Sequence, residues 1–183
     1  MKPTTVHTFL AYLEDRPGVL NRVASLFRRR AFNIESLTVG RTEREGVSRM
    51  TLVMRADDDA ARRLEANLYK LVNVLAVEDV SHSPTVVREL ALIKVRADES
   101  VRAQVMQLCE VFRARMLDVA PETLVVEITG AQDKIDGLIE MLRPYGILEL
   151  VRTGAVAMTR GNAEDTTGAG NGTREPRREE AAA

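Results

Sequence analysis

Alternating hydrophobic and polar positions predict a strand followed by a helix at the start of the chain. Val6 to Glu14 (VHTFLAYLE) has the composition of a strand. In the next segment apolar residues recur at helical spacing and arginines occupy the opposite face. The apolar positions are Val19, Leu20, Val23, Leu26 and Phe27, and the arginines are Arg22, Arg28, Arg29 and Arg30.

The pattern continues with a hairpin, a second helix and a fourth strand. Asn33 to Gly40 is β-rich, and Arg49 to Arg55 places its apolar residues, Met50, Leu52 and Met54, on one side of a strand. Asp57, Asp58 and Asp59 suit the N-terminus of a helix. That helix carries an apolar stripe of Ala61, Leu64, Leu68 and Leu71, and Val74 to Val80 follows as a strand. The order is βαββαβ.

The same order repeats after a boundary at residues 83–85 (SPT). Four strands are expected at residues 89–97, 116–119, 123–129 and 147–151, with 155–158 as an extra edge. One helical stripe is Val101, Val105, Leu108 and Phe112, and the other is Ile135, Leu138, Ile139 and Leu142, ended by residues 144–146 (PYG). A period of roughly 80 residues predicts an α+β protein with two ferredoxin-like domains.

These patterns predict three segments. Residues 1–82 form the first domain and residues 83–160 the second. Residues 161–183 (GNAEDTTGAGNGTREPRREEAAA) hold almost no apolar side chain larger than Ala. Such a composition cannot bury enough surface to become ordered, so we expect a disordered tail.

Composition narrows the function classes. The chain has 183 residues, of which 45% are hydrophobic and 4% aromatic, and its net charge is −1. No global field therefore favours nucleic acid or an anionic membrane as a partner. One cysteine, Cys109, and two histidines, His7 and His82, offer no catalytic or metal-binding spacing. Without a signal-type segment or a run of about 18 apolar residues, we expect a cytoplasmic protein.

The segment DRPGVL, residues 15–20, offers candidate binding chemistry. Pro17 has a backbone angle suited to a first helical turn, and Gly18 leaves its backbone open to close approach. Free N–H groups of Gly18, Val19 and Leu20 at a helix N-terminus suit a carboxylate, while Asp15 suits an ammonium group. A zwitterionic amino acid would satisfy both. On these residues alone, a simple strand-to-helix turn explains the segment equally well.

Several ordered blocks resemble one known family. DRPGVL is followed by FNIESL at 32–37, SRMT at 48–51, KLVNVL at 70–75, RELALIK at 88–94 and GAVAMTRG at 154–161. Together with Phe112-Arg113 and Asp118-Val119, these blocks resemble the small regulatory subunits of acetohydroxyacid synthase, also called acetolactate synthase, across residues 6–161. The first domain resembles their amino-acid-binding ACT domain.

The resemblance implies a regulatory subunit without a catalytic site of its own, within a transketolase-type transferase complex. Its expected partner is the catalytic large subunit, which uses thiamine diphosphate, Mg²⁺ and often FAD; no cofactor is expected in this chain. The resemblance further implies a homodimer that activates the enzyme and confers feedback inhibition by valine or another branched-chain amino acid. Nucleic acid and membranes are not expected as partners.

The resemblance also implies the effector-binding residues. Asp15, Gly18, Val19 and Leu20 would hold the polar end of the amino acid, and the partner chain would supply Asn33 and Ile34. An amide suits a zwitterion, because it donates and accepts, and Ile34 suits an aliphatic side chain. Many members carry Asn where this chain has Asp15, so the preferred effector stays open.

Alternative readings stay open for several features. Asn33 and Ile34 also suit a simple strand start, and the run Arg28, Arg29 and Arg30 suits either a solvated helix end or contact with an acidic partner. Cys109 and both histidines are predicted to be structural. The functional alternative is a free-standing ACT-domain amino-acid sensor; an independent enzyme or an RNA-binding module is disfavoured by the lack of a nucleophile-base pair and of aromatic residues.

Overall fold

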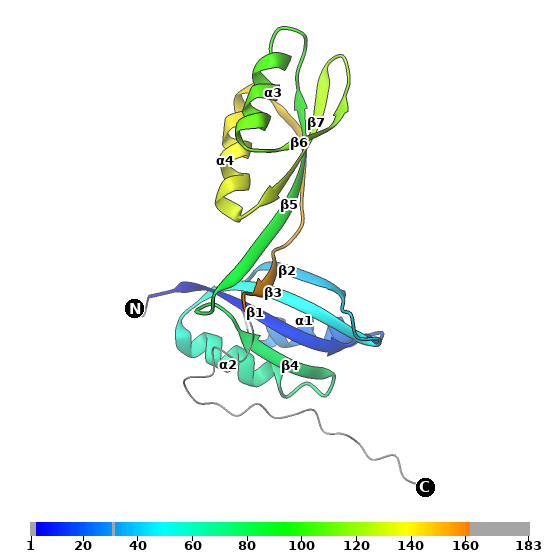
Figure 1. Cartoon of the computed structure of the whole chain (residues 1–183). Helices are drawn as coiled ribbons and strands as arrows, with labels where there is room; N and C mark the ends of the chain where they lie inside the picture. The colour runs from blue at the N-terminus through cyan, green and yellow to red at the C-terminus, as the bar shows by residue number, and fades with distance from the viewer. Residues whose placement is uncertain (1–2, 31, 162–183) are drawn as a thin grey trace. The chain divides into compact units, whose positions relative to one another are not determined.

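A computed structural model describes residues 3–30 and 32–161 of the chain (Figure 1). The chain divides into two compact units. Of the described residues, unit 1 comprises 3–30, 32–86 and 158–161, and unit 2 comprises Val87–Ala157. The limits predicted from the sequence, 1–82 and 83–160, remain predictions. All of the predicted tail except Gly161 lies outside the described residues. No helix in the described part of the chain is long and apolar enough to cross a membrane.

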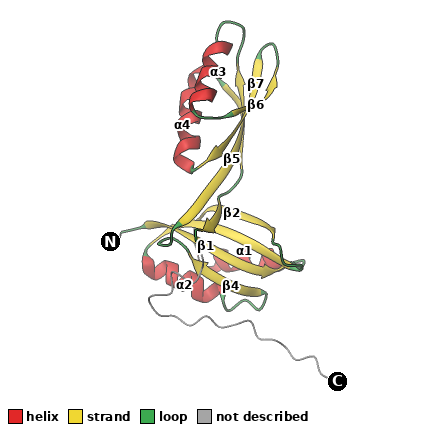
Figure 2. Ribbon diagram, viewed as in Figure 1, coloured by secondary structure: helices red, strands yellow, loops and turns green. Residues whose placement is uncertain are grey.

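Unit 1 has the predicted βαββαβ order. Its elements are β1 (Thr5–Glu14), α1 (Val19–Arg30), β2 (Ile34–Arg41), β3 (Val47–Ala56), α2 (Asp58–Leu68) and β4 (Val74–Asp79). The strands form one antiparallel sheet in the order β2-β3-β1-β4. Strand β2 is therefore an edge strand. The predicted α+β, ferredoxin-like class is confirmed in this unit, as the helices and strands of Figure 2 show.

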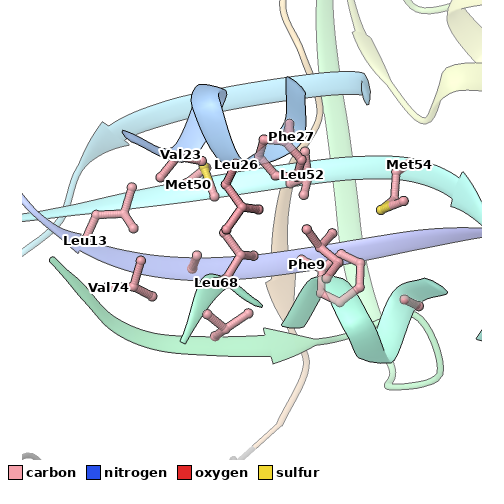
Figure 3. Packing of buried hydrophobic residues seen from close by; sticks show 14 of the residues in the cluster. Phe9, Leu13, Val23, Leu26, Phe27, Met50, Leu52, Met54, Leu68 and Val74 are labelled. Atoms are coloured by element: carbon pink, nitrogen blue, oxygen red, sulfur yellow. The ribbon is translucent and has the colours of Figure 1, made fainter. Parts of the chain in front are cut away.

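One face of this sheet carries the core of unit 1 (Figure 3). Side chains on one face of a strand come from alternate positions. The buried residues of that face are Phe9, Ala11 and Leu13 from β1 and Met50, Leu52 and Met54 from β3. They pack against Val19, Val23, Leu26 and Phe27 of α1 and against Ala61, Leu64 and Leu68 of α2. Both helices thus cover the same face of the sheet.

Unit 2 repeats the architecture with an additional strand. Two strands cross its limits: β5 (Thr85–Arg96) begins and β9 (Val156–Thr159) ends in unit 1. The elements between them are α3 (Arg102–Val111), β6 (Arg115–Val119), β7 (Thr123–Gly130), α4 (Gln132–Leu142), a 3₁₀ turn (Arg143–Tyr145) and β8 (Ile147–Arg152). The sheet order is β6-β7-β5-β8, and β9 pairs with β5. The predicted extra edge strand is therefore present. Strand β5 starts four residues before its predicted start at Glu89.

Helix ends differ from the predicted stripes by one to three residues. The stripe of α2 was expected to include Leu71, but the helix ends at Leu68 and Leu71 packs on the core from the following turn. In unit 2, Val101 and Phe112 lie at the two caps of α3 rather than within it. The Phe112 ring then packs against α4 at Gly137, where a Cβ would lie 3.0 Å from its Cε1 atom. The absence of a side chain at Gly137 leaves room for the Phe112 ring against α4.

Cys109 belongs to the core of unit 2, as its apolar surroundings in the sequence predicted. It is 1% exposed and packs with residues of α4 and the central strands. Burial raises the pKa of the Cys109 thiol to about 11. The thiolate is the nucleophilic form of cysteine, so this side chain is a poor nucleophile in the folded protein.

We predict that Cys109 resists thiol reagents until the protein unfolds. With a pKa of about 11, only about one thiol in a thousand is ionised at pH 8, and the ionised fraction rises as the pH rises. Labelling with a chromogenic disulfide at pH 8 should be slow for the folded chain and complete within minutes in guanidinium chloride. Rapid stoichiometric labelling of the folded protein would contradict this assignment.

Arg152 links three elements of unit 2 through two ion pairs. Its Nη1 donates to Asp136 Oδ1 of α4 at 2.7 Å, and its Nη2 donates to Glu89 Oε2 of β5 at 2.8 Å. The side chains of Arg152 and Glu89 are 28% and 12% exposed. A hydrogen-bonded charge pair this far from water is costly to break, because removing one partner leaves the other partly buried and uncompensated.

We predict that Arg152→Ala destabilises unit 2 by about 1 to 3 kcal/mol, because Glu89 loses its charged donor. Arg143→Ala is the matched control. Arg143 also pairs with a carboxylate, that of Glu140 at 2.8 Å, but both side chains are more than 60% exposed, and such pairs contribute about 0 to 1 kcal/mol. Urea unfolding followed by circular dichroism measures both variants. Equal losses would show that burial of the Arg152 pairs has no energetic consequence.

Candidate functional site

The connection between β1 and α1 is a tight turn built around Pro17 and Gly18. The N–H of Val19 donates to the Arg16 carbonyl at 3.4 Å, and Gly18 has a φ of +85°. Proline followed by a residue of positive φ, closed by a bond to the fourth residue, is the arrangement of a type II turn. The backbone angle of Pro17 was predicted to suit a first helical turn, but Pro17 lies in the preceding turn and α1 starts at Val19. The reason is Gly18, whose left-handed conformation cannot continue a helix.

The N-terminus of α1 is capped without a side chain. The Gly18 carbonyl accepts the Arg22 N–H at 3.1 Å, so Gly18 is the capping residue. In α2, by contrast, the Asp57 carboxylate accepts the Ala60 N–H at 2.7 Å. The first turn of α1 also lacks an acidic residue. The positive end of the α1 dipole is thus uncompensated by any side chain of that turn.

Gly18 also faces open space. A Cβ built on Gly18 would meet no heavy atom within 4 Å. Glycine is therefore required here by the positive φ and not by crowding within unit 1. The combination of an open backbone and a helix end capped by glycine alone suits a small anion, which is the ligand chemistry that the sequence predicted for this turn.

Asp15 lies beside this turn and already has a cationic neighbour. Its backbone N–H donates to the Gly46 carbonyl at 2.8 Å, which fixes the main chain at the end of β1. The carboxylate Oδ2 lies 3.7 Å from Nε of Arg41, the last residue of β2. Their side chains are 45% and 90% exposed, so this pair contributes little and leaves the carboxylate available to another cation.

The other predicted residues divide by burial. Val19 is 5% exposed and belongs to the core, so only its backbone can face a ligand. Leu20 is 48% exposed. Asn33, just before β2, is exposed, whereas Ile34 is half-buried and packs on the core. The turn thus exposes polar backbone groups, and Leu20 exposes apolar surface beside them. Val19 and Ile34 instead hold the start of α1 and the start of β2 against the core.

The predicted residues form two groups at opposite ends of the sheet. In β3, Val47 pairs with Glu14, next to the turn, while Met54 pairs with Ile34. Strand β2 has eight residues between the two groups, and a strand rises about 3.3 Å per residue. The structure therefore brings Asp15, Gly18, Val19 and Leu20 together but leaves Asn33 and Ile34 roughly 20 Å away.

A cluster of polar contacts around the buried His7 side chain was not predicted from the sequence. His7 is 2% exposed at the margin of the core, stacked on Phe9. Its Nδ1 lies 3.2 Å from Asp79 Oδ2, and its Nε2 lies 3.1 Å from Thr5 Oγ1 and 3.6 Å from Asp58 Oδ1. The alternation of the strand could have predicted the burial of His7, because His7 is two residues from the core residue Phe9 and therefore lies on the same face of β1. The acidic run at the start of α2 could have predicted a carboxylate near it.

The surroundings of His7 favour the structural role predicted for it. Its contacts join β1 to the first turn of α2 and to β4, and the His82 ring lies 6.3 Å away. The Asp79 carboxylate also acts on Glu65: partial burial is the larger cause that raises the pKa of Glu65, and repulsion from Asp79 is the smaller one. Over residues 3–30 and 32–161, no three His, Cys, Asp or Glu side chains are placed to hold a metal ion.

Each unit matches a family model, and the descriptions of both models refer to the small subunit of acetolactate synthase, also called AHAS. Residues 10–76 match the model described as "AHAS small subunit-like ACT domain", and residues 88–161 match "Small subunit of acetolactate synthase". The first match spans the Gly18 turn and both ends of β2. The second spans nearly all of unit 2.

Relatives of known name agree over most of the chain. A probable acetolactate synthase small subunit of Archaeoglobus fulgidus is 49% identical over 85% of this chain and 98% of its own length. The acetolactate synthase small subunit of Mycolicibacterium smegmatis is 46% identical over 86% and 93%. The crystal structure of the small subunit from Thermotoga maritima superposes with a TM-score of 0.80 at 41% identity, covering 86% and 99%. The chain therefore belongs to the family of acetolactate synthase small subunits.

Proposed function

We propose that this chain is the regulatory subunit of an acetolactate synthase. It binds a separate catalytic large subunit, raises the activity of that subunit and makes it sensitive to a branched-chain amino acid such as valine. Family membership across both units supports the role in the complex. The observation that carries the effector site is the open turn at Gly18, where α1 begins without a side-chain cap. Thiamine diphosphate, Mg²⁺ and FAD would belong to the catalytic partner.

The chemistry of the turn suits the polar end of a free amino acid. The effector carboxylate would take N–H groups at the start of α1, where the helix dipole adds about half a positive charge. The effector ammonium would take the Asp15 carboxylate, which would exchange its exposed partner Arg41 for the ligand. Leu20 offers apolar surface next to these groups.

We further propose that a second copy completes the site. Asn33 and Ile34 lie at the far end of β2 from the Gly18 turn, so one chain does not assemble all the predicted residues. Strand β2 is an edge strand, and its last residue, Arg41, reaches Asp15 at 3.7 Å. Antiparallel pairing of two β2 edges about a two-fold axis would place Ile34 of one copy near Arg41 and Asp15 of the other. Two equivalent sites would result.

Regulation then follows from linkage. An amino acid bound across the interface would hold α1 of one copy against β2 of the other. If the catalytic subunit binds the two arrangements unequally, the effector shifts its activity. Coupling of this kind is typically about 1 to 3 kcal/mol, or roughly 5- to 150-fold in affinity.

We predict that Gly18→Asp abolishes effector binding and Gly18→Asn does not. The two side chains have the same shape and tolerate positive φ about equally well, but only the carboxylate repels an anion at the helix N-terminus. Isothermal titration of the wild-type chain with valine, leucine and isoleucine should give a dissociation constant of about 0.01 to 1 mM for at least one of them.

The same pair of variants tests the regulatory role. Mixed with a catalytic large subunit, Gly18→Asp should still activate the enzyme but no longer confer inhibition, whereas Gly18→Asn should resemble the wild type. Full effector sensitivity of Gly18→Asp would show that the site lies elsewhere. Absence of any effect of the wild-type chain on the enzyme would refute the regulatory role.

We predict that two defective chains can form one working site. Chains carrying Gly18→Asp and chains carrying Asn33→Ala would be given different affinity tags, co-expressed and purified as mixed dimers. In a mixed dimer, one site pairs both defects, and the other pairs the intact turn of one chain with the intact strand of the other. Titration should give about one effector per mixed dimer and little binding to either parent. A mixed dimer as defective as its parents would place the whole site within one chain.

A further inference from the structure

A groove between the two helices of unit 1 gathers positive charge. It has a volume of about 450 Å³ and is lined by Leu26, Arg29, Arg30, Asn67, Lys70 and Leu71. We call it the basic groove. Arg29 and Arg30 come from the last turn of α1, and Lys70 follows the end of α2. Among the described residues, the lining contains three cationic side chains and no carboxylate.

Helix electrostatics favours cations at both helix ends. Cations in the last turn of α1 are stabilised by the negative end of its dipole, which explains Arg28, Arg29 and Arg30 as a solvated helix end. Lys70 directly follows the C-cap residue of α2, Tyr69, so the negative end of the α2 dipole favours it as well. Two separate elements therefore direct cations to one groove.

The cations of the groove are not neutralised within the described part of the chain. None of Arg29, Arg30 and Lys70 has a carboxylate within ion-pair distance there. The Arg30 guanidinium only donates to Asn67 Oδ1, at 3.5 Å. Like charges held together without a counter-charge repel, so an external anionic group would be favoured at this place.

The apolar floor of the groove and the exposure of its cations favour an acidic protein segment over a small anion as the ligand. Leu26 is 6% exposed and Leu71 is half-buried, so the floor is apolar. The three cationic side chains are exposed, and exposed ion pairs are each worth little. A small anion would stay in water there, whereas a protein segment that covers the floor excludes water and engages several cations at once.

We propose that the basic groove docks an acidic segment of the catalytic large subunit. The inference rests on the proposed function, because it takes that subunit as the partner. It also gives α1 a position in the regulation. The N-terminus of α1 is the proposed effector end, and its last turn lines the groove. A single helix of 12 residues thus contacts both ligands, and a shift of α1 at one end is transmitted to the other.

Charge reversal with a matched control tests this docking surface. Arg29→Glu with Lys70→Glu removes two cations from the groove. Arg28→Glu with Arg63→Glu changes the net charge equally, at exposed positions of α1 and α2 that do not line the groove. The affinity of each full-length chain for the purified large subunit would be measured by interferometry at low and moderate salt.

The wild-type affinity should fall with salt, because the contacts are electrostatic. Arg29→Glu with Lys70→Glu should weaken binding at least about tenfold and flatten the salt dependence, while the control pair stays within about threefold of the wild type. Valine titration and circular dichroism should be unchanged in both. Equal losses in the two pairs would reduce the effect to net charge and overturn the docking surface.

Two further outcomes separate the groove from the proposed function. If the wild type binds the large subunit and the groove variant binds equally well, the docking surface is wrong and the regulatory role stands. If the groove variant loses saturable binding of inorganic phosphate but keeps its partner affinity, the groove is a small-anion site instead. A wild-type chain that does not bind the large subunit overturns both proposals.

Discussion

The antiparallel register between β2 and β3 is the constraint on which the chemistry of unit 1 depends. Met54 pairs with Ile34, while Arg49 and Ser48 pair with Gly40 and Arg41. A paired strand is rigid along its length, so the start of β2 and the Gly18 turn cannot approach each other within one chain. A site that needs both must be shared between copies, and the exposed edge of β2 is where a second copy would pair.

Helix α1 has a different kind of asymmetry. Its first turn has a glycine cap and no acidic residue, whereas its last turn carries three arginines. The N–H groups of the first turn and the arginines of the last turn are therefore available to ligands. In α2, by contrast, the Asp57 carboxylate caps the first turn. The core fixes the apolar side of α1 through Val23 and Phe27. A rigid, well-packed helix whose two ends face different ligands is suited to couple two binding events, and that is the regulatory logic proposed for this chain.

Unit 2 is held by contacts that local patterns do not reveal. Glu89, Asp136 and Arg152 are far apart in the sequence, yet their side chains form one ion-pair network between β5, α4 and β8. The Phe112 ring rests on the gap left by Gly137. These contacts join elements that hydrophobic periodicity places only approximately, and they explain why α3 and α4 stay in register on their sheet.

The sequence by itself determined the order of elements and predicted a binding chemistry for the turn. Periodicity of two and of 3.6 residues is a local property, so β1, α1 and the stripe of α4 followed from the pattern of apolar positions. The ends of the helices did not follow from this pattern. Leu71 continues the apolar stripe of α2 in the sequence, although the helix ends at Leu68. The resemblance of DRPGVL and FNIESL to one family indicated the site residues without their geometry.

Only the tertiary structure decided which groups meet. It brought His7 to Asp58 and Asp79, placed Lys70 beside Arg29 and Arg30, and kept Asn33 away from Gly18. Each of these outcomes depends on strand register and helix packing between segments tens of residues apart. Such contacts leave no periodic signal in the sequence, because the spacing along the chain between two partners is set by the elements that lie between them.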